Sequence, residues 1–198
     1  MNLARWKQLM EDFGFSENRD TYHLLMEYYS EKHRAYHNIE HIEDCLTQLD
    51  AIVEEIPWRK EIELALWFHD AIYNPYGKDN ELKSAQLAME FLKQQNGNAQ
   101  LESILFNLIM ATLHKEEPTN LAEKIMMDID ISILGTDYPT YRDYAKKIRR
   151  EYRLVPGILY RKKRKEILCN FLERQPLYYS KYFKRLETRA RENLRREI

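Results

Sequence analysis

Apolar residues recur along this chain at intervals of three and four, the spacing that places side chains on one face of an α-helix. The clearest examples are the segments 58–70, 79–95 and 101–114. In the first and last of these, apolar residues are dense enough for a helix that is buried on most sides. Alternation of apolar and polar residues, which would indicate a strand, never extends beyond a few residues. The helical spacing predicts further helices at 2–13, 18–33, 39–55, 120–131, 138–154, 158–173 and 178–196.

Turn-forming residues separate these segments. The chain has only 5 Gly and 6 Pro, fewer than an all-β fold of this length usually needs, and it contains no internal repeat or flexible linker. The pattern therefore predicts an all-α fold: a compact helical bundle that forms one domain over residues 1–198. The predicted breaks lie at Pro57, 74–77, 96–98, Glu117-Pro118, Gly135, Pro156-Gly157 and Pro176.

Composition excludes several classes of protein. With 44% apolar and 32% charged residues, the chain is not a disordered or low-complexity segment. Cys45 and Cys169 are too few for a disulfide scaffold and do not form a metal-binding cysteine pair. No apolar run approaches the ~20 residues that a membrane span needs. Glu11 and Asp12 interrupt the first residues, so no signal peptide is visible. We expect a soluble, cytoplasmic protein without a membrane partner.

Charge is distributed unevenly along the chain. Residues 1–141 carry 12 basic and 25 acidic side chains, whereas residues 142–198 carry 19 basic and 7 acidic ones, and the sum is the formal charge of −1. The two parts either pack together with solvated outer faces, or the basic part attracts an anionic substrate toward a site on the acidic part. The net charge gives no overall attraction to nucleic acid, which is not expected as a partner. The basic run 161–165 is interpreted as exposed helix surface.

Three short segments combine histidine or carboxylate side chains with apolar surroundings. His69-Asp70 ends the apolar segment 58–70 just before a loop, and Asp128-Ile129-Asp130 ends another mostly apolar helix. An isolated buried charge is costly, so such carboxylates must be paired, protonated or bound to metal. The third segment is His37-Asn38-Ile39-Glu40-His41 at a helix start. A cation held by imidazole and carboxylate groups would satisfy these side chains, and such a site suits Mn, Fe, Zn, Ni or Mg.

The segment 37–41 also fits the H-x-x-E-H pattern of inverted zinc peptidases, in which two histidines one helical turn apart bind zinc. That interpretation leaves His69, Asp70 and the Asp-x-Asp segment without a role. The chain is also shorter than such peptidases usually are. We therefore favour one site that uses all three segments.

The order His41, His69-Asp70 and Asp130 resembles the H…HD…D signature of the HD-domain metal-dependent phosphohydrolases, an all-α superfamily. It is most similar to one bacterial group of predicted HD-type phosphohydrolases. The similar segments follow one another in the expected order over roughly four fifths of the chain, at 34–42, 67–73, 79–85, 111–114, 128–135, 148–152 and 187–194.

The resemblance implies that His41, His69, Asp70 and Asp130 bind one divalent metal ion. Asp128 would then support these ligands or shape the phosphate site. His114 matches a position where some two-metal relatives have a further ligand, but the sequence lacks the additional histidine of the full two-metal pattern.

The resemblance further implies hydrolysis of a phosphomonoester or phosphodiester, most simply a small nucleotide, by a metal-activated water. Asp70 would also orient that water, and Glu81 or His114 would handle the proton, although Glu81 is equally a first-turn residue favoured by the helix dipole. His37 would either face the substrate or hold the start of its helix. The two remaining substrate-binding candidates, Arg34 and Arg149, would either clamp phosphate oxygens or form ion pairs within the bundle.

Two functions of other classes stay open at this point. An HD-type fold could act as a non-catalytic sensor that binds metal or nucleotide, or as an interaction protein in which the metal only joins helices. The sequence does not fix the substrate, the metal or the oligomeric state, and a homodimer is one option.

Overall fold

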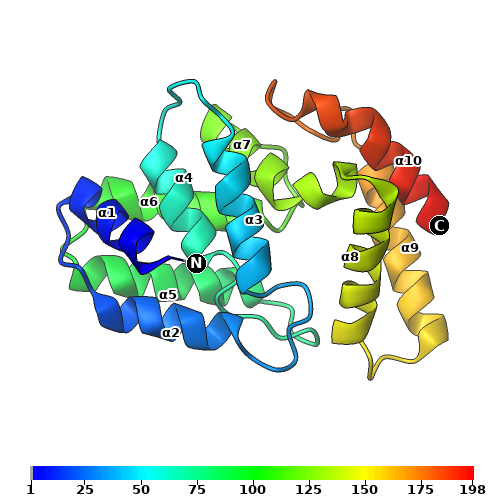
Figure 1. Cartoon of the computed structure of the whole chain (residues 1–198), viewed down its shortest axis with the longest axis horizontal. Helices are drawn as coiled ribbons and strands as arrows, with labels where there is room; N and C mark the ends of the chain where they lie inside the picture. The colour runs from blue at the N-terminus through cyan, green and yellow to red at the C-terminus, as the bar shows by residue number, and fades with distance from the viewer. Residues whose placement is uncertain (1) are drawn as a thin grey trace.

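The computed structural model describes residues 2–198, which fold into α-helices and two short 3-10 helices, with no strand in that range. The prediction of an all-α bundle is confirmed (Figure 1). The elements are α1 (Leu3–Phe13), α2 (Arg19–Tyr29), α3 (Ile39–Asp50), α4 (Arg59–Phe68), α5 (Asn80–Gln94), α6 (Ala99–Ala111), α7 (Leu121–Asp130), η1 (Ser132–Gly135), α8 (Tyr138–Glu151), α9 (Gly157–Glu173), η2 (Lys184–Leu186) and α10 (Glu187–Glu197).

Side-chain caps explain where many of these helices begin. An Asn or Asp side chain accepts a backbone N–H bond from the first turn, which is one of the groups that a helix leaves unpaired. Such caps precede α1, α3, α6, α7 and α8, at Asn2, Asn38, Asn98, Asn120 and Asp137.

The last helix begins later than its apolar pattern predicts. Residues 178–183 were expected to be helical, but α10 starts only at Glu187. The Glu187 carboxylate accepts the backbone N–H groups of Leu177 and Tyr178, and the Asp128 carboxylate accepts those of Tyr179 and Ser180. These side chains satisfy the backbone donors outside a helix, and the segment is therefore held in an irregular path.

The core is centred on α4, which packs against α1, α3, α5, α6 and α7. Its residues from Leu64 to Phe68 have no exposed surface. Trp67 meets Trp6 of α1 edge to face, with ring centroids 5.2 Å apart. Because α4 is surrounded on all sides, the residue that follows it, His69, lies deep in the bundle, with 1% of its surface exposed.

Helices α8, α9 and α10 gather on one side of the molecule, beyond η1 (Figure 1). Both η2 and α10 contact η1, and at Gly135 an added Cβ would lie 2.5 Å from the Cβ of Leu186 in η2. The buried Asn193 side chain donates to the carbonyl oxygens of Leu134 and Thr136 and secures this junction. A search of residues 2–198 finds no helix with the length and apolarity that crossing a membrane requires.

Candidate metal centre

The four predicted metal ligands come from three helices that pack against one another. His41 lies in the first turn of α3, and Asp130 is the last residue of α7. His69 and Asp70 follow directly after α4, at the point where the buried helix ends. The ends of these elements meet, so residues separated by up to 89 positions lie together.

One donor atom from each residue contributes to a tight cluster. His41 Nε2 lies 3.3 Å from His69 Nε2, 3.5 Å from Asp70 Oδ2 and 3.4 Å from Asp130 Oδ1. His69 Nε2 lies 3.3 Å from Asp70 Oδ2 and 3.6 Å from Asp130 Oδ1. Ligand atoms bound at about 2.0–2.2 Å to one ion stand roughly 3–3.5 Å apart, so this spacing fits a single cation at the centre.

The hydrogen bonding of His69 prepares it as a ligand. Its Nδ1 lies 3.0 Å from the carbonyl oxygen of Leu66, which can only accept, so Nδ1 carries the proton. In the neutral form, a ring with this tautomer presents the lone pair of Nε2 to the cluster, as in metal-bound histidines generally. The two imidazole nitrogens and two carboxylate oxygens therefore form a donor set that a divalent cation fits.

The surrounding charges favour ionised carboxylates. Burial alone would raise the pKa of Asp70, but the neighbouring imidazoles of His69, His41 and His37 outweigh it and lower that pKa. Burial opposes the charge of Asp130 in the same way, and its contacts with His114, His41 and His69 lower its pKa well below the usual range. Both groups are thus anionic at neutral pH, the form that binds a cation.

A cavity of about 410 Å³ opens onto this cluster and includes Asp70 and Asp130 in its wall. Three further predicted site residues, His37, Glu81 and His114, line the same cavity. The rest of the wall includes aromatic and aliphatic side chains from the C-terminal helices, such as Tyr144, Ile167 and Phe171. The cavity therefore lies between the ligand-bearing helices and the α8–α9 pair.

His114 holds the Asp130 carboxylate. Its Nε2 lies 2.8 Å from Asp130 Oδ2, while Oδ1 of the same carboxylate belongs to the ligand cluster. The backbone of His114 is left-handed (φ 53°), and its carbonyl oxygen accepts a hydrogen bond from Arg174. This backbone turn after α6 aims the imidazole at the metal centre.

His37 is oriented by a buried carboxylate that the sequence did not single out as functional. Its Nδ1 lies 2.8 Å from Glu151 Oε2, which also accepts a hydrogen bond from the Tyr73 hydroxyl. The other oxygen of Glu151 accepts the backbone N–H groups of residues 35, 36 and 37. Burial by itself would raise the pKa of Glu151, but the contacts with His37 and these backbone groups lower it to about 2.

Glu81 lies in the first turn of α5, and its side chain lines the cavity. Burial raises its pKa, and the nearby charges of Asp70 and Asp130 raise it further. Two lysines that the sequence analysis passed over, Lys78 and Lys115, line the same cavity. In the sequence, the only indication that these lysines belong to the site was their position, Lys78 in the loop before α5 and Lys115 next to His114.

Arg34 does not reach the cavity as a phosphate clamp would. Its side chain is fully buried and pairs with Glu31. The guanidinium also donates to the carbonyl oxygens of His37, Asp70 and Ala71. These bonds place Arg34 behind the metal centre, where it ties the loop before α3 to the segment after α4.

Arg149 and Asp128 also have structural contacts. Arg149 donates to the carbonyl oxygens of Tyr152 and Val155 and stacks on Tyr160, so it closes the end of α8. It does not line the cavity. Asp128 is fully buried and binds the backbone of the 179–180 segment, and burial raises its pKa to about 6 despite those hydrogen bonds. The contacts of Arg34 and Arg149 therefore fit the alternative in which both arginines stabilise the helical bundle and do not clamp phosphate.

Cys45 adds a second possible donor group beside the centre. Its Sγ lies 3.8 Å from both ring nitrogens of His41, and it forms a potential ligand set with His41 and His69. Burial raises the pKa of the Cys45 thiol, which favours the neutral form. The His/Asp set has lower-pKa donors and is the better cation site.

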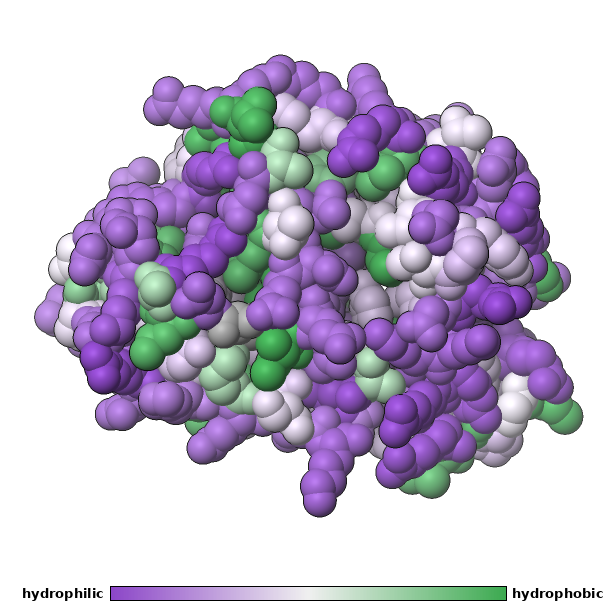
Figure 2. Space-filling model, in the orientation of Figure 1, coloured by the Kyte–Doolittle hydropathy of each residue, from purple (hydrophilic) through white to green (hydrophobic). Residues whose placement is uncertain are grey.

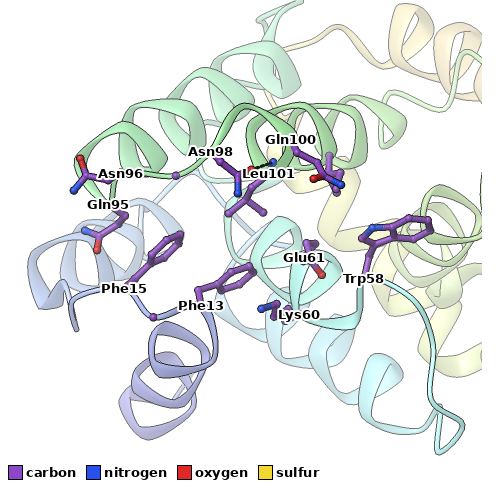
Figure 3. Close-up of a pocket in the computed structure, with 13 residues that line it drawn as sticks. Phe13, Phe15, Trp58, Lys60, Glu61, Gln95, Asn96, Asn98, Gln100 and Leu101 are labelled. Atoms are coloured by element: carbon purple, nitrogen blue, oxygen red, sulfur yellow. Dashed lines mark hydrogen bonds between the residues drawn. The ribbon is translucent and has the colours of Figure 1, made fainter.

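A cavity of about 450 Å³ lies at the opposite end of α4 (Figure 3). Figure 3 shows Trp58, Lys60 and Glu61 at the start of that helix, together with Phe13, Phe15 and several carboxamide side chains. None of the residues in its wall belongs to a cluster that could hold a metal. The candidate functional site is therefore the cavity at the His/Asp cluster.

Comparison with known proteins finds no match of this chain to a family model, a curated protein or a solved structure. The assignment of a function therefore depends on the geometry and the chemistry of the site.

Proposed function

We propose that this protein is a metal-dependent phosphohydrolase of the HD-domain type. The single observation that carries the proposal is the convergence of His41, His69, Asp70 and Asp130 on one point at the edge of a cavity. Two imidazoles with two carboxylates leave coordination positions open for substrate and water. A closed structural site would instead use four ligands with no adjoining cavity.

A divalent ion held there would polarise a phosphoryl oxygen and lower the pKa of a bound water. Asp70 lines the cavity and would orient that water. Glu81 has a raised pKa and exchanges the proton more readily near neutral pH than an ordinary carboxylate. His114 fixes the Asp130 carboxylate, a role that keeps one of its oxygens directed at the ligand cluster.

The substrate in this proposal is a phosphomonoester or phosphodiester, with a small nucleotide as the first choice. Lys78 and Lys115 take the place that Arg34 and Arg149 were expected to fill, since they line the cavity and can offset phosphate charge. His37, whose Nδ1 donates to Glu151, adds an imidazole ring at the same wall. A cavity of about 410 Å³ accommodates a ligand of nucleotide size.

The first test is the metal content of the purified protein and of the His69→Ala variant, measured by elemental analysis. We expect about one divalent ion per chain in the wild type and a loss in the variant. His23→Ala is the matched control, because His23 is an exposed residue of α2. The absence of metal from the wild type, even after reconstitution with Mn, Fe, Ni or Zn, would refute the proposal.

The second test separates catalysis from binding. The metal-loaded protein is assayed for phosphate release from a panel of phosphomonoesters and phosphodiesters, beside Asp70→Ala. We expect turnover that Asp70→Ala abolishes and that Lys115→Ala reduces mainly through a higher KM. Nucleotide binding without turnover at every metal tested would favour the non-catalytic sensor instead.

A further inference from the structure

The turn between α8 and α9 exposes an apolar patch. Leu154, Ile158 and Leu159 have 75%, 78% and 49% of their surface exposed. Tyr76, 52% exposed, lines the same hollow as Leu154 and extends the patch onto the loop before α5. Single exposed apolar side chains are ordinary, but a group at a projecting turn indicates a surface that is covered by something else.

Basic side chains surround this patch. Residues 149–165 contain eight Lys or Arg and one acidic residue, the buried Glu151. Two of the eight are paired, Lys163 with Glu166 and Arg164 with Glu197. Arg149 binds backbone carbonyl oxygens at the end of α8. The other five form no ion pair within residues 2–198: Arg150, Arg153, Arg161, Lys162 and Lys165. Figure 2 shows hydrophobic side chains at this edge of the molecule within a hydrophilic surround.

Against the expectation of no membrane partner, we propose that the α8–α9 turn docks on a membrane surface that contains anionic lipid. The aliphatic side chains enter the boundary between headgroups and acyl chains, and the surrounding cations contact lipid phosphates and carboxylates. The contact is peripheral, since no described helix could cross a membrane. The formal charge of −1 gives no indication of this basic surface, because the acidic residues that balance it lie mostly in residues 1–141.

Two features favour lipid over the other anionic partners. Nucleic acid would pair with the cations but would leave three aliphatic side chains in water, at no gain. The acidic first part of the chain would be repelled by an anionic membrane, which orients the molecule with the α8–α9 turn toward the surface. Hydrophobic and electrostatic attraction then act at the same place.

The test is co-sedimentation of the full chain with phosphatidylcholine vesicles, with and without phosphatidylserine. We expect binding only to the anionic vesicles, and a loss of roughly tenfold in affinity for Ile158→Ser or Leu154→Ser. Lys162→Glu combined with Arg153→Glu should abolish binding. Val53→Ser is the matched control, because Val53 is 94% exposed on the loop between α3 and α4, away from the turn.

Unchanged thermal unfolding of each variant shows that the fold is intact, as expected for exposed positions. Equal binding to neutral vesicles, or no binding to anionic ones, overturns the proposal. The proposal is also overturned if Lys162→Glu removes binding while Ile158→Ser leaves it unchanged. The contact would then be purely electrostatic, as expected for a surface that binds nucleic acid or an acidic protein. As a second readout, brominated lipids should quench a tryptophan at position 158 (Ile158→Trp) more than one at position 53 (Val53→Trp).

Discussion

His114 orients one carboxylate of the candidate metal site, that of Asp130. One oxygen of Asp130 accepts from His114 Nε2 at 2.8 Å, and the other faces His41 and His69. We expect His114→Ala to weaken metal binding by about 10- to 100-fold, because the carboxylate loses the contact that orients it. Metal titration followed by calorimetry measures this, with His23→Ala as control. An unchanged affinity would show that Asp130 needs no such support.

A second prediction concerns Arg34, whose buried guanidinium bonds to three backbone carbonyl groups and to Glu31. Arg34→Ala removes the donor of all four bonds and leaves the carbonyl oxygen of Ala71 buried without it. We expect the free energy of unfolding to fall by about 3 kcal/mol or more. Urea denaturation checks this, and Arg150→Ala, an exposed neighbour in α8, should change little. A stable variant with a raised KM for phosphate esters would instead support a phosphate clamp.

Residue type alone did not distinguish a basic side chain that faces the cavity from one that only stabilises the fold. A guanidinium suits phosphate oxygens and backbone carbonyl groups equally well, so only burial distinguishes Arg34 from a substrate ligand. The same limit applies to Lys78 and Lys115, which look like any other surface lysine in the sequence until the fold turns them to the cavity. That His41, His69, Asp70 and Asp130 lie together was easier to predict, because a buried His/Asp pair is costly without a partner charge.

At the scale of helices, Glu151 joins α8 to the loop that precedes α3. Its carboxylate is fully buried and holds His37 together with three backbone N–H groups. The pKa of this group falls from 4.5 to about 2 on folding. Folding therefore stabilises the ionised form of Glu151, and this carboxylate holds α8 against the loop before α3.

This linkage predicts how stability depends on pH. Because the folded pKa of Glu151 is lowered, its contribution is fully present above about pH 4.5 and is lost as the pH falls toward 2. The contribution is on the order of 3 kcal/mol. We expect Glu151→Gln to lose stability at pH 7 and to show a shallower decline below pH 4.5, measured by urea unfolding at each pH. Glu166→Gln, at an exposed position, should follow the wild-type curve.

Most helices could be predicted from apolar spacing and break residues because those signals are local. The start of α10 could not, since it depends on the carboxylates of Asp128 and Glu187 reaching backbone groups at 177–180. Asp128 is 49 residues or more away from that segment along the chain. Such long-range acceptors leave no trace in helical periodicity.

At the scale of the whole molecule, the His/Asp cluster brings together three helices that no disulfide connects. His41, Asp130 and the His69-Asp70 pair belong to α3, α7 and the end of α4. A cation bound at their meeting point would bind the folded chain and not the unfolded one, and would therefore stabilise the fold by mass action. Without it, two carboxylates face each other inside the bundle with only imidazoles to offset their charge.

Chelation should therefore lower the melting temperature of the wild-type protein. An ion present at about 1,000 times its Kd contributes about 4 kcal/mol, which for a chain of this size corresponds to roughly 8–16 °C. We expect EDTA to cause a shift of that order and added metal to reverse it. Asp130→Asn should melt at the same temperature with and without EDTA, whereas Asp143→Asn, on the exposed face of α8, should respond like the wild type. If elemental analysis shows that the metal is gone and the melting temperature is unchanged, the cluster does not bind the ion that was removed.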